Sequence, residues 1–268
     1  MFEPFQYEFF VRGIIAGALV GALCGLIGVY IVLRKMAYIG HGLAHAIFGG
    51  AVVSYVMAIN FYVGASLWGF LSAVLISLAS RKRQISNDAA IGIVTTASFA
   101  LGIAIISRYK SFTRSFDAAL FGNILGITNG DLIAIAVVTL LCSLIMFFWY
   151  KRFLFLIFDE EVARVYRLPV TIIDTIFSLI LAATVVVSIQ ILGVTLIAAA
   201  VVIPPVTARL LSNNFHKVIF ISVALGSLYS VAGMYLSYYF DISSGAAIVL
   251  FATFWFLCVS GYSWLRNR

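Results

Sequence analysis

Charged residues are scarce in this chain. Asp, Glu, Lys and Arg make up only 10% of the 268 residues, whereas 63% are hydrophobic. Soluble domains contain about 25% charged residues, and no soluble core of this size buries so much apolar surface. The composition therefore excludes a soluble globular protein. It predicts an all-α, polytopic integral membrane protein that forms a single domain over residues 1–268.

Three further absences exclude particular kinds of site, activity and processing. The cysteines Cys24, Cys142 and Cys258 lack paired spacing, so neither a disulfide framework nor a thiolate metal site is indicated. No P-loop motif occurs, so we expect no enzyme activity of the chain itself and ATP hydrolysis only by a partner. Glu3 and Glu8, rather than a basic region, precede the first apolar stretch, which argues against a cleaved signal peptide.

Long apolar stretches recur along the chain at about the 20 residues needed to cross a bilayer. We expect nine membrane-spanning helices, or eight if two stretches share one crossing. The nine stretches are 12–33, 36–59, 61–79, 89–107, 131–149, 170–189, 191–211, 218–240 and 245–264.

The distribution of Lys and Arg sets the expected orientation, because cytoplasmic loops of membrane proteins are enriched in them. An external N-terminus and a cytoplasmic C-terminus place 13 of the 17 basic residues inside. Segment 108–130 is then an external loop or a re-entrant segment. The net charge of +7 indicates attraction to membrane lipid at the inner leaflet rather than binding of nucleic acid.

Two of the three histidines, His41 and His45, lie in the apolar stretch 36–59. On a helix, residues four apart project from one face. At ~1.5 Å per residue, they lie about 9 Å and about 15 Å along the helix from its cytoplasmic end. Ionisable side chains at this depth are costly and usually functional, and neutral imidazole binds divalent transition metals. The pair predicts a metal pathway.

The histidine pair supplies only two ligands, whereas closed zinc sites usually have four. A structural alternative is that each imidazole hydrogen-bonds a neighbouring carbonyl or hydroxyl. Asp131, Asp174 and Asp241 lie at the ends of the stretches, and none is an obvious third ligand. A homodimer in which the two copies of 36–59 face each other would bring four imidazoles together.

Segment 158–168 lies in the longest internal loop and has an acidic start, interspersed charges and Pro169 as its stop. These features predict a short amphipathic cytoplasmic helix. It either docks onto a cytoplasmic partner or lies on the membrane, and its acidic cluster favours docking because an anionic leaflet repels it. The residues expected to carry this contact are Asp159, Glu160, Glu161, Ala163 and Arg164.

Pro204 and Pro205 interrupt the apolar stretch 191–211. They remove two backbone donors and predict a kink or the end of a half-helix. Broken helices at membrane depth often line a cavity, so the pair is either a gating element or a structural kink. The glycine steps in 12–33 predict close helix packing, with gating as the alternative.

Several segments resemble the membrane permeases of bacterial ABC importers for manganese, zinc and iron. Segment 34–46, RKMAYIGHGLAHA, is similar to the family pattern R-x-M-x-x-x-G-D-A-x-x-H. Similar blocks follow in family order at 90–93 with 100–102, 120–126, 193–210 and 244–250. Each block alone is weak, but their order and spacing are specific.

The resemblance implies a homodimeric permease of the bacterial plasma (inner) membrane. It implies ATP-driven uptake of manganese, zinc or iron by alternating access, with the metal as substrate and no permanently bound cofactor. Segment 158–168 would couple to a separate ATP-binding subunit, and an extracytoplasmic metal-binding protein would deliver the metal. His41 and His45 would lie in the metal pathway.

The chain departs from the family pattern at two places. His41 replaces the usual aspartate, and Ser243 or Ser244 stands where a proline often follows the eighth span. A carboxylate favours manganese, whereas neutral imidazole also suits zinc, iron, nickel or copper. The sequence therefore favours zinc and manganese about equally.

Three alternatives remain. A permease for an iron chelate or cobalamin has the same kinds of partner but is normally a longer chain with ten spans. An intramembrane metalloprotease using His41 and His45 needs glutamate where this chain has Gly42. A haem-binding subunit needs histidines on separate helices, and only His216 remains, in an internal loop.

Overall fold

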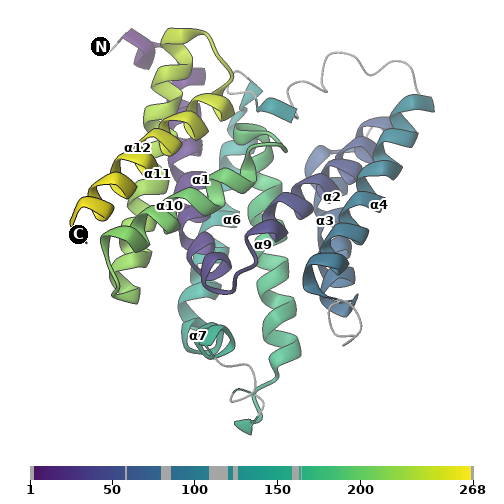
Figure 1. Ribbon diagram of the computed structural model, residues 1–268. Helices are drawn as coiled ribbons and strands as arrows, with labels where there is room; N and C mark the ends of the chain where they lie inside the picture. The colour runs from purple at the N-terminus through teal and green to yellow at the C-terminus, as the bar shows by residue number, and fades with distance from the viewer. Residues whose placement is uncertain are drawn as a thin grey trace. The chain divides into compact units, whose positions relative to one another are not determined.

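The computed structural model describes residues 3–57, 59–79, 86–108, 120–122, 126–158, 163 and 165–266, and these contain helices and no strand (Figure 1). After a short 3-10 helix at Glu3–Gln6, the helices are α1 (Glu8–Leu33), α2 (Ala37–Val56), α3 (Phe61–Ala79), α4 (Asn87–Arg108), α6 (Asn129–Phe148), α7 (Tyr150–Phe158), α9 (Val170–Leu192), α10 (Ile197–Leu211), α11 (Phe215–Phe240) and α12 (Ser244–Arg266).

Seven of these helices are long and apolar enough to cross a membrane, namely α1, α3, α4, α6, α9, α11 and α12. They correspond to seven of the nine expected spans. Large apolar side chains remain exposed on them, as at Phe147 and Phe148, which are both 75% exposed. A lipid environment removes the cost of that exposure. The polytopic all-helical membrane fold is thereby confirmed.

The two remaining expected spans differ from each other. With 20 residues, α2 has the length of a crossing. In contrast, α10 has 15 residues, or about 22 Å, which is less than the ~30 Å of a hydrocarbon core. The stretch 191–211 is therefore not one helix. It begins with the last residues of α9 and turns at Gly193, whose φ is +73°.

The chain forms two compact units, which are described separately. The first comprises Met1–Ala37, Asp117–Leu140 and Val187–Arg268, and the second comprises Tyr38–Phe116 and Leu141–Val186. Accordingly, α1, α10, α11 and α12 belong to the first unit, and α2, α3, α4 and α7 to the second. The residues of α6 and α9 are divided between them.

In the first unit, glycines let α1 approach its neighbours at backbone distance. A Cβ at Gly21 would collide with the carbonyl of Gly226 on α11, and one at Gly25 with the carbonyl of Ser222. The hydroxyl of Ser222 donates to the Gly25 carbonyl at 2.7 Å. Because lipid offers no hydrophobic drive between helices, such close contact stabilises their association. The predicted packing role of these glycines is confirmed.

The turn between α9 and α10 is tied to a neighbouring turn at Gly122, whose φ is +79°. A side chain at Gly122 would collide with the Ile191 carbonyl, so both space and backbone conformation require glycine there. Thr195 donates its hydroxyl to the Leu120 carbonyl at 2.9 Å. The end of segment 108–130 is thus fixed to the first unit, whereas residues 109–119 and 123–125 lie outside the described residues.

In the second unit, α2 packs closely against both α3 and α4. Gly50 lies against Trp68 on α3, and Gly49 lies against the carbonyl of Ser98 on α4. Gly42 contacts the side chains of Ile91 and Thr95, where a Cβ would leave too little space. The glycines of α2 therefore fix its position between two helices, and with it the position of the histidines.

Candidate functional site

The imidazoles of His41 and His45 meet on one face of α2, as their spacing predicts. Their Nε2 atoms lie 3.2 Å apart, and the ring centroids lie 4.5 Å apart at an interplanar angle of 82°. Both nitrogens therefore converge on the same small region of space. One helical turn suffices to produce this convergence.

The separation of the two nitrogens suits shared coordination of one ion. Imidazole nitrogens bind zinc at about 2.0–2.1 Å, and a tetrahedral angle then places two of them about 3.3 Å apart. The measured 3.2 Å is close to that value. Without a metal, the same distance permits one Nε2–H to donate to the other Nε2. The pair can thus alternate between a hydrogen bond and metal ligation without a large side-chain movement.

Aromatic rings flank the pair on either side. His45 packs against Phe99 of α4 with centroids 4.8 Å apart, and His41 lies 5.6 Å from Tyr38. The Nδ1 atom of His45 is buried and has no hydrogen-bond partner among the described residues. Metal-binding histidines usually donate this second N–H to a carboxylate or carbonyl. Among the described residues His45 lacks that support, which would weaken its hold on a metal ion.

No cluster of three or more His, Cys, Asp or Glu side chains suited to a metal occurs in the described part of the chain. Among the described residues, the two histidines therefore have no third ligand-type side chain beside them. Both imidazoles are half-buried, and Tyr38, one turn before His41, is 54% exposed. This face of α2 is partly open, so further ligands can approach it.

Of the residues expected to couple to a partner, only Ala163 is described. It is 1% exposed, and its carbonyl accepts a hydrogen bond from the Leu168 amide at 3.0 Å. Ala163 therefore supports the loop internally rather than presenting a contact surface. Asp159, Glu160, Glu161 and Arg164 lie outside the described residues.

A separate short helix, α7, directly follows α6 and is not predicted by the sequence pattern. It buries Phe153 and Leu156, and the ring of Phe153 packs edge-on against Phe177 of α9 with centroids 5.9 Å apart. The guanidinium of Arg152 lies 4.4 Å from the ring centre of Trp149. The sequence signal was the change from an uninterrupted apolar run to the basic pair at 151–152 followed by apolar residues.

An exposed apolar patch accompanies α7 and is also not predicted by the sequence pattern. It consists of Phe155, Val165 and Tyr166, which are 45%, 79% and 69% exposed. The rings of Phe155 and Tyr166 lie 6.1 Å apart, so these two side chains form one contiguous apolar surface. Its place in the longest loop between spans makes it a candidate contact surface for another protein.

Pro204 and Pro205 lie within α10, and both are buried. The helix continues past them to Leu211, so they do not end it, and the break in the stretch 191–211 lies at residues 193–196 instead. The expected half-helix boundary at the prolines is therefore wrong. Gly28 of α1 packs beside Pro205 and against the Val201 carbonyl, which lacks its helical donor.

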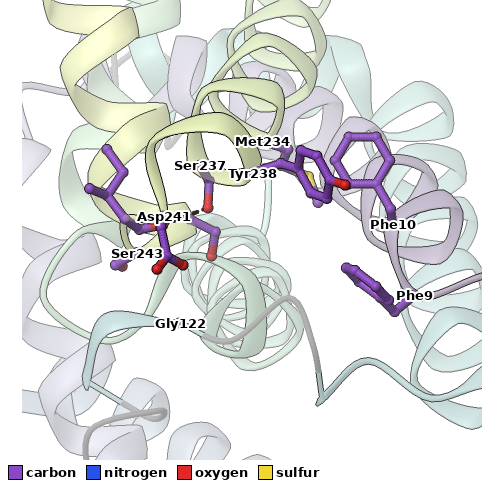
Figure 2. A pocket seen from close by; sticks show the side chains of 10 residues that line it. Phe9, Phe10, Gly122, Met234, Ser237, Tyr238, Asp241 and Ser243 are labelled. Atoms are coloured by element: carbon purple, nitrogen blue, oxygen red, sulfur yellow. Dashed lines mark hydrogen bonds between the residues drawn. The ribbon is translucent and has the colours of Figure 1, made fainter. Parts of the chain in front are cut away.

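A cavity of about 360 Å³ opens in the first unit where α11 meets α12. Figure 2 shows the aromatic rings of Phe9 and Phe10 on one side and the group formed by Ser237, Asp241 and Ser243 on the other. Asp241 ends α11 with a φ of +51°. Within the described chain, its carboxylate has no hydrogen-bond or ionic partner.

The serines at this cavity serve the fold. Ser243 donates to the Phe121 carbonyl at 2.7 Å, and Ser244 donates to the Ile191 carbonyl at 2.9 Å. These bonds tie the start of α12 to segment 120–122 and to the end of α9. They give a structural role to the positions at which the chain departs from the proline of the family pattern.

Comparisons with known proteins agree with this architecture. The chain is 38% identical over 248 residues to the manganese transport system membrane protein MntC of Listeria innocua, covering 92% of this chain and 88% of the relative. It is 32% identical over 257 residues to the chelated iron transport system membrane protein YfeC of Yersinia pestis, covering 96% and 87%.

A solved structure is also similar. PsaBC from Streptococcus pneumoniae in complex with Fab contains a chain that is 32% identical, with a TM-score of 0.85. The similarity covers 95% of this chain and 91% of the other. Residues 6–263 match the ABC 3 transport family. The protein described here therefore belongs to the ABC 3 transport family and is a multi-pass membrane permease.

Proposed function

We propose that this permease takes up a divalent transition metal in an ATP-driven importer, and that His41 and His45 bind the metal during passage. The 3.2 Å separation of their Nε2 atoms carries the proposal, because it suits two ligands of one ion. Relatives named for manganese and chelated iron transport agree with this class of substrate.

Binding requires a change in protonation at the pair. When one Nε2–H donates to the other Nε2, neither Nε2 has a free lone pair, whereas metal ligation needs a free lone pair on both. One imidazole must therefore release its Nε2 proton or carry a proton on Nδ1 instead. For His45 this second position has no partner to accept the N–H. The resulting moderate affinity favours release of the ion over storage.

A second copy of the chain would complete the ligand set. Two histidines leave at least two positions of a tetrahedral ion open, and the half-buried face beside Tyr38 is accessible to another α2. Two chains facing each other along α2 would contribute four imidazoles. Rocking of the two chains about this contact would then expose the ion alternately to the two sides of the membrane.

The energy for this movement comes from a separate ATP-binding subunit. The patch of Phe155, Val165 and Tyr166 offers an exposed apolar contact for that subunit. An extracytoplasmic metal-binding protein would sit on the external side of the first unit, where Asp241 lines an open cavity. Attraction between this carboxylate and the cation would favour delivery there.

The ligand set favours ions that accept nitrogen donors. Replacing a carboxylate with neutral imidazole at position 41 removes a hard anionic ligand that suits manganese. Zinc and ferrous iron tolerate this change better than manganese does. Manganese uptake still occurs when the binding protein delivers that ion in excess, since selectivity also depends on supply.

Metal uptake into vesicles containing the whole transporter tests this function. The variants are His41→Ala and His45→Ala, each measured with manganese, zinc and ferrous iron in competition. His216→Ala is the matched control, because His216 is an exposed histidine outside α2. We expect both α2 variants to lose at least about 90% of uptake, because loss of a residue that only supports a metal ligand already costs about 10–100-fold, and the control to retain it.

His41→Asp addresses the choice of metal. We expect this variant to transport and to shift the competition toward manganese, because it restores a carboxylate ligand. Unchanged uptake by both alanine variants would contradict the histidine pathway. If His41→Asp left the order of the three metals unchanged, position 41 would not determine selectivity.

A further inference from the structure

A second cavity in the first unit, of about 490 Å³, lies between the C-terminal ends of α10 and α12. These two helices pack against each other. Its volume is within the usual range of small-molecule sites, about 300–1,000 Å³. The polar residues that line it are Arg209, Ser212, Asn213, Tyr262, Ser263 and Arg266.

Arg209 and Arg266 both line this cavity, and no carboxylate of a described residue does so. Arg209 lies in the last turn of α10 and Arg266 in the last turn of α12. In the described part of the chain, neither arginine has an ion pair or side-chain hydrogen bond. The hydroxyls of Ser212 and Ser263 add neutral hydrogen-bond donors beside the two charges. This combination suits a phosphate group, which guanidinium binds with two parallel hydrogen bonds.

Each arginine also stabilises the negative end of its own helix dipole. That role explains one basic residue at each helix end, but it does not require a shared cavity. In addition, both charged residues and two serines line one cavity, which the helix-dipole role does not explain. This arrangement distinguishes this place from Arg108 at the end of α4, which has the same helical position and lines neither of the two cavities described here.

The surroundings of the cavity place it at a membrane interface. Tyr262, Trp264 and Leu265 on the last turns of α12 are 61%, 55% and 68% exposed, and exposed aromatic residues concentrate at the level of lipid headgroups. Toward the membrane interior, α12 exposes Leu257 and Phe254. An acyl chain can follow this apolar surface while its headgroup reaches the arginines.

We propose that the cavity between α10 and α12 binds the phosphate of an anionic phospholipid. The count of basic residues assigns these helix ends to the cytoplasmic side, where anionic lipids attract Lys and Arg. The bound lipid would neutralise Arg209 and Arg266 together and hold the two helix ends in fixed relation. Since α10 also packs on α1, the lipid stabilises the packing of the first unit.

The test uses the full chain, purified with its ATP-binding subunit and reconstituted in phosphatidylcholine membranes. The association of spin-labelled phosphatidylglycerol is measured relative to spin-labelled phosphatidylcholine. We expect about a fivefold loss of preference for each of Arg209→Gln and Arg266→Gln, and roughly a 25-fold loss for the double variant. The charge-matched control is the double variant Lys151→Gln with Lys217→Gln, which changes exposed lysines that do not line the cavity.

Ser263→Leu provides an independent variant, because it fills the cavity without changing the net charge. Loss of lipid preference in this variant and in the arginine variants, with the control within about twofold of wild type, supports the proposal. An equal loss of lipid preference in the lysine control would show that general surface charge causes the preference. That result would overturn the proposal. Full preference in the double arginine variant would also overturn it.

Two further outcomes distinguish other ligands. If millimolar inorganic phosphate abolishes the lipid preference of the wild-type protein, the cavity takes a free anion and the lipid proposal fails. If the double arginine variant retains its lipid preference but no longer co-purifies with the ATP-binding subunit, the surface contacts protein and the proposal is overturned. Unchanged preference in phosphate and intact co-purification are the results we expect.

Discussion

Gly28 of α1 lies directly against the carbonyl oxygen of Val201 in α10. Pro205 has no backbone N–H, so the Val201 carbonyl lacks the donor that an uninterrupted helix would supply. The missing side chain of Gly28 lets the α1 backbone occupy the space beside this carbonyl. A proline in one helix and a glycine in another thus form one packing unit inside the membrane, where an α-carbon hydrogen can partly replace the lost donor.

Gly28→Ala is therefore expected to destabilise the permease by about 1–3 kcal/mol, the usual cost of overpacking. The added Cβ would collide with the Val201 carbonyl and force α1 and α10 apart. Thermal unfolding of the detergent-purified chain measures this. Gly261→Ala is the control, since a Cβ at that position has nothing within 4 Å. Equal unfolding temperatures for Gly28→Ala and wild type would show that the contact is loose.

The apolar patch on the long loop is expected to hold the ATP-binding subunit. Replacing Val165 and Tyr166 together with serine should weaken that association about 30-fold, because a buried aromatic anchor often contributes ~2 kcal/mol to an interface. Titration of the purified ATP-binding subunit gives the dissociation constant. Phe220→Ser on α11 is the control, with a side chain 76% exposed. A loss shared by the control would mean that reduced apolarity, not this patch, is responsible.

A facing arrangement of two α2 helices predicts cross-linking between copies at Tyr38. In a background where the exposed Cys258 is replaced with serine, Tyr38→Cys should form a dimer with a short bis-maleimide reagent. Val63→Cys on α3 serves as the comparison, since Val63 is 50% exposed. Dimer formation at position 63 but not at position 38 would place the contact between copies elsewhere.

Acid should weaken metal binding, because protonation removes the imidazole lone pair that binds the ion. Wild type has two imidazoles in each chain to keep neutral, whereas His41→Asp has one. Below neutral pH, we expect affinity in wild type to fall about twice as steeply as in His41→Asp, on logarithmic scales. Equilibrium metal binding across a pH series provides both slopes. Equal slopes would remove His41 from the ligand set.

The sequence was sufficient to predict those features that depend on local pattern. Apolar runs near 20 residues predict α1 and α9 because bilayer thickness fixes helix length. The i, i+4 spacing predicts the convergence of His41 and His45 because helical geometry alone produces it. The glycines of α1 recur at helical spacing, so helical geometry also predicts that they lie on one face and allow close packing.

Other features were not accessible from local pattern. The turn at Gly193 interrupts an apolar run whose composition does not change there, so 191–211 resembled one span. The proline pair of α10 packs against Gly28, which is distant in sequence. The exposed patch that includes Tyr166 depends on contact with the ring of Phe155, and the sequence pattern does not predict this contact. The serines at the proline position of the family pattern donate to the carbonyls of Phe121 and Ile191, which are also distant in the chain.

Equilibrium binding of radioactive zinc and manganese to the purified transporter tests the central claim most directly. Wild type and His216→Ala should bind the ion with the same affinity and stoichiometry. The double variant His41→Ala with His45→Ala should lose this binding by at least about 100-fold, the upper end of what support for a metal ligand contributes. Wild-type affinity in that double variant would contradict the assignment of His41 and His45 to the metal pathway.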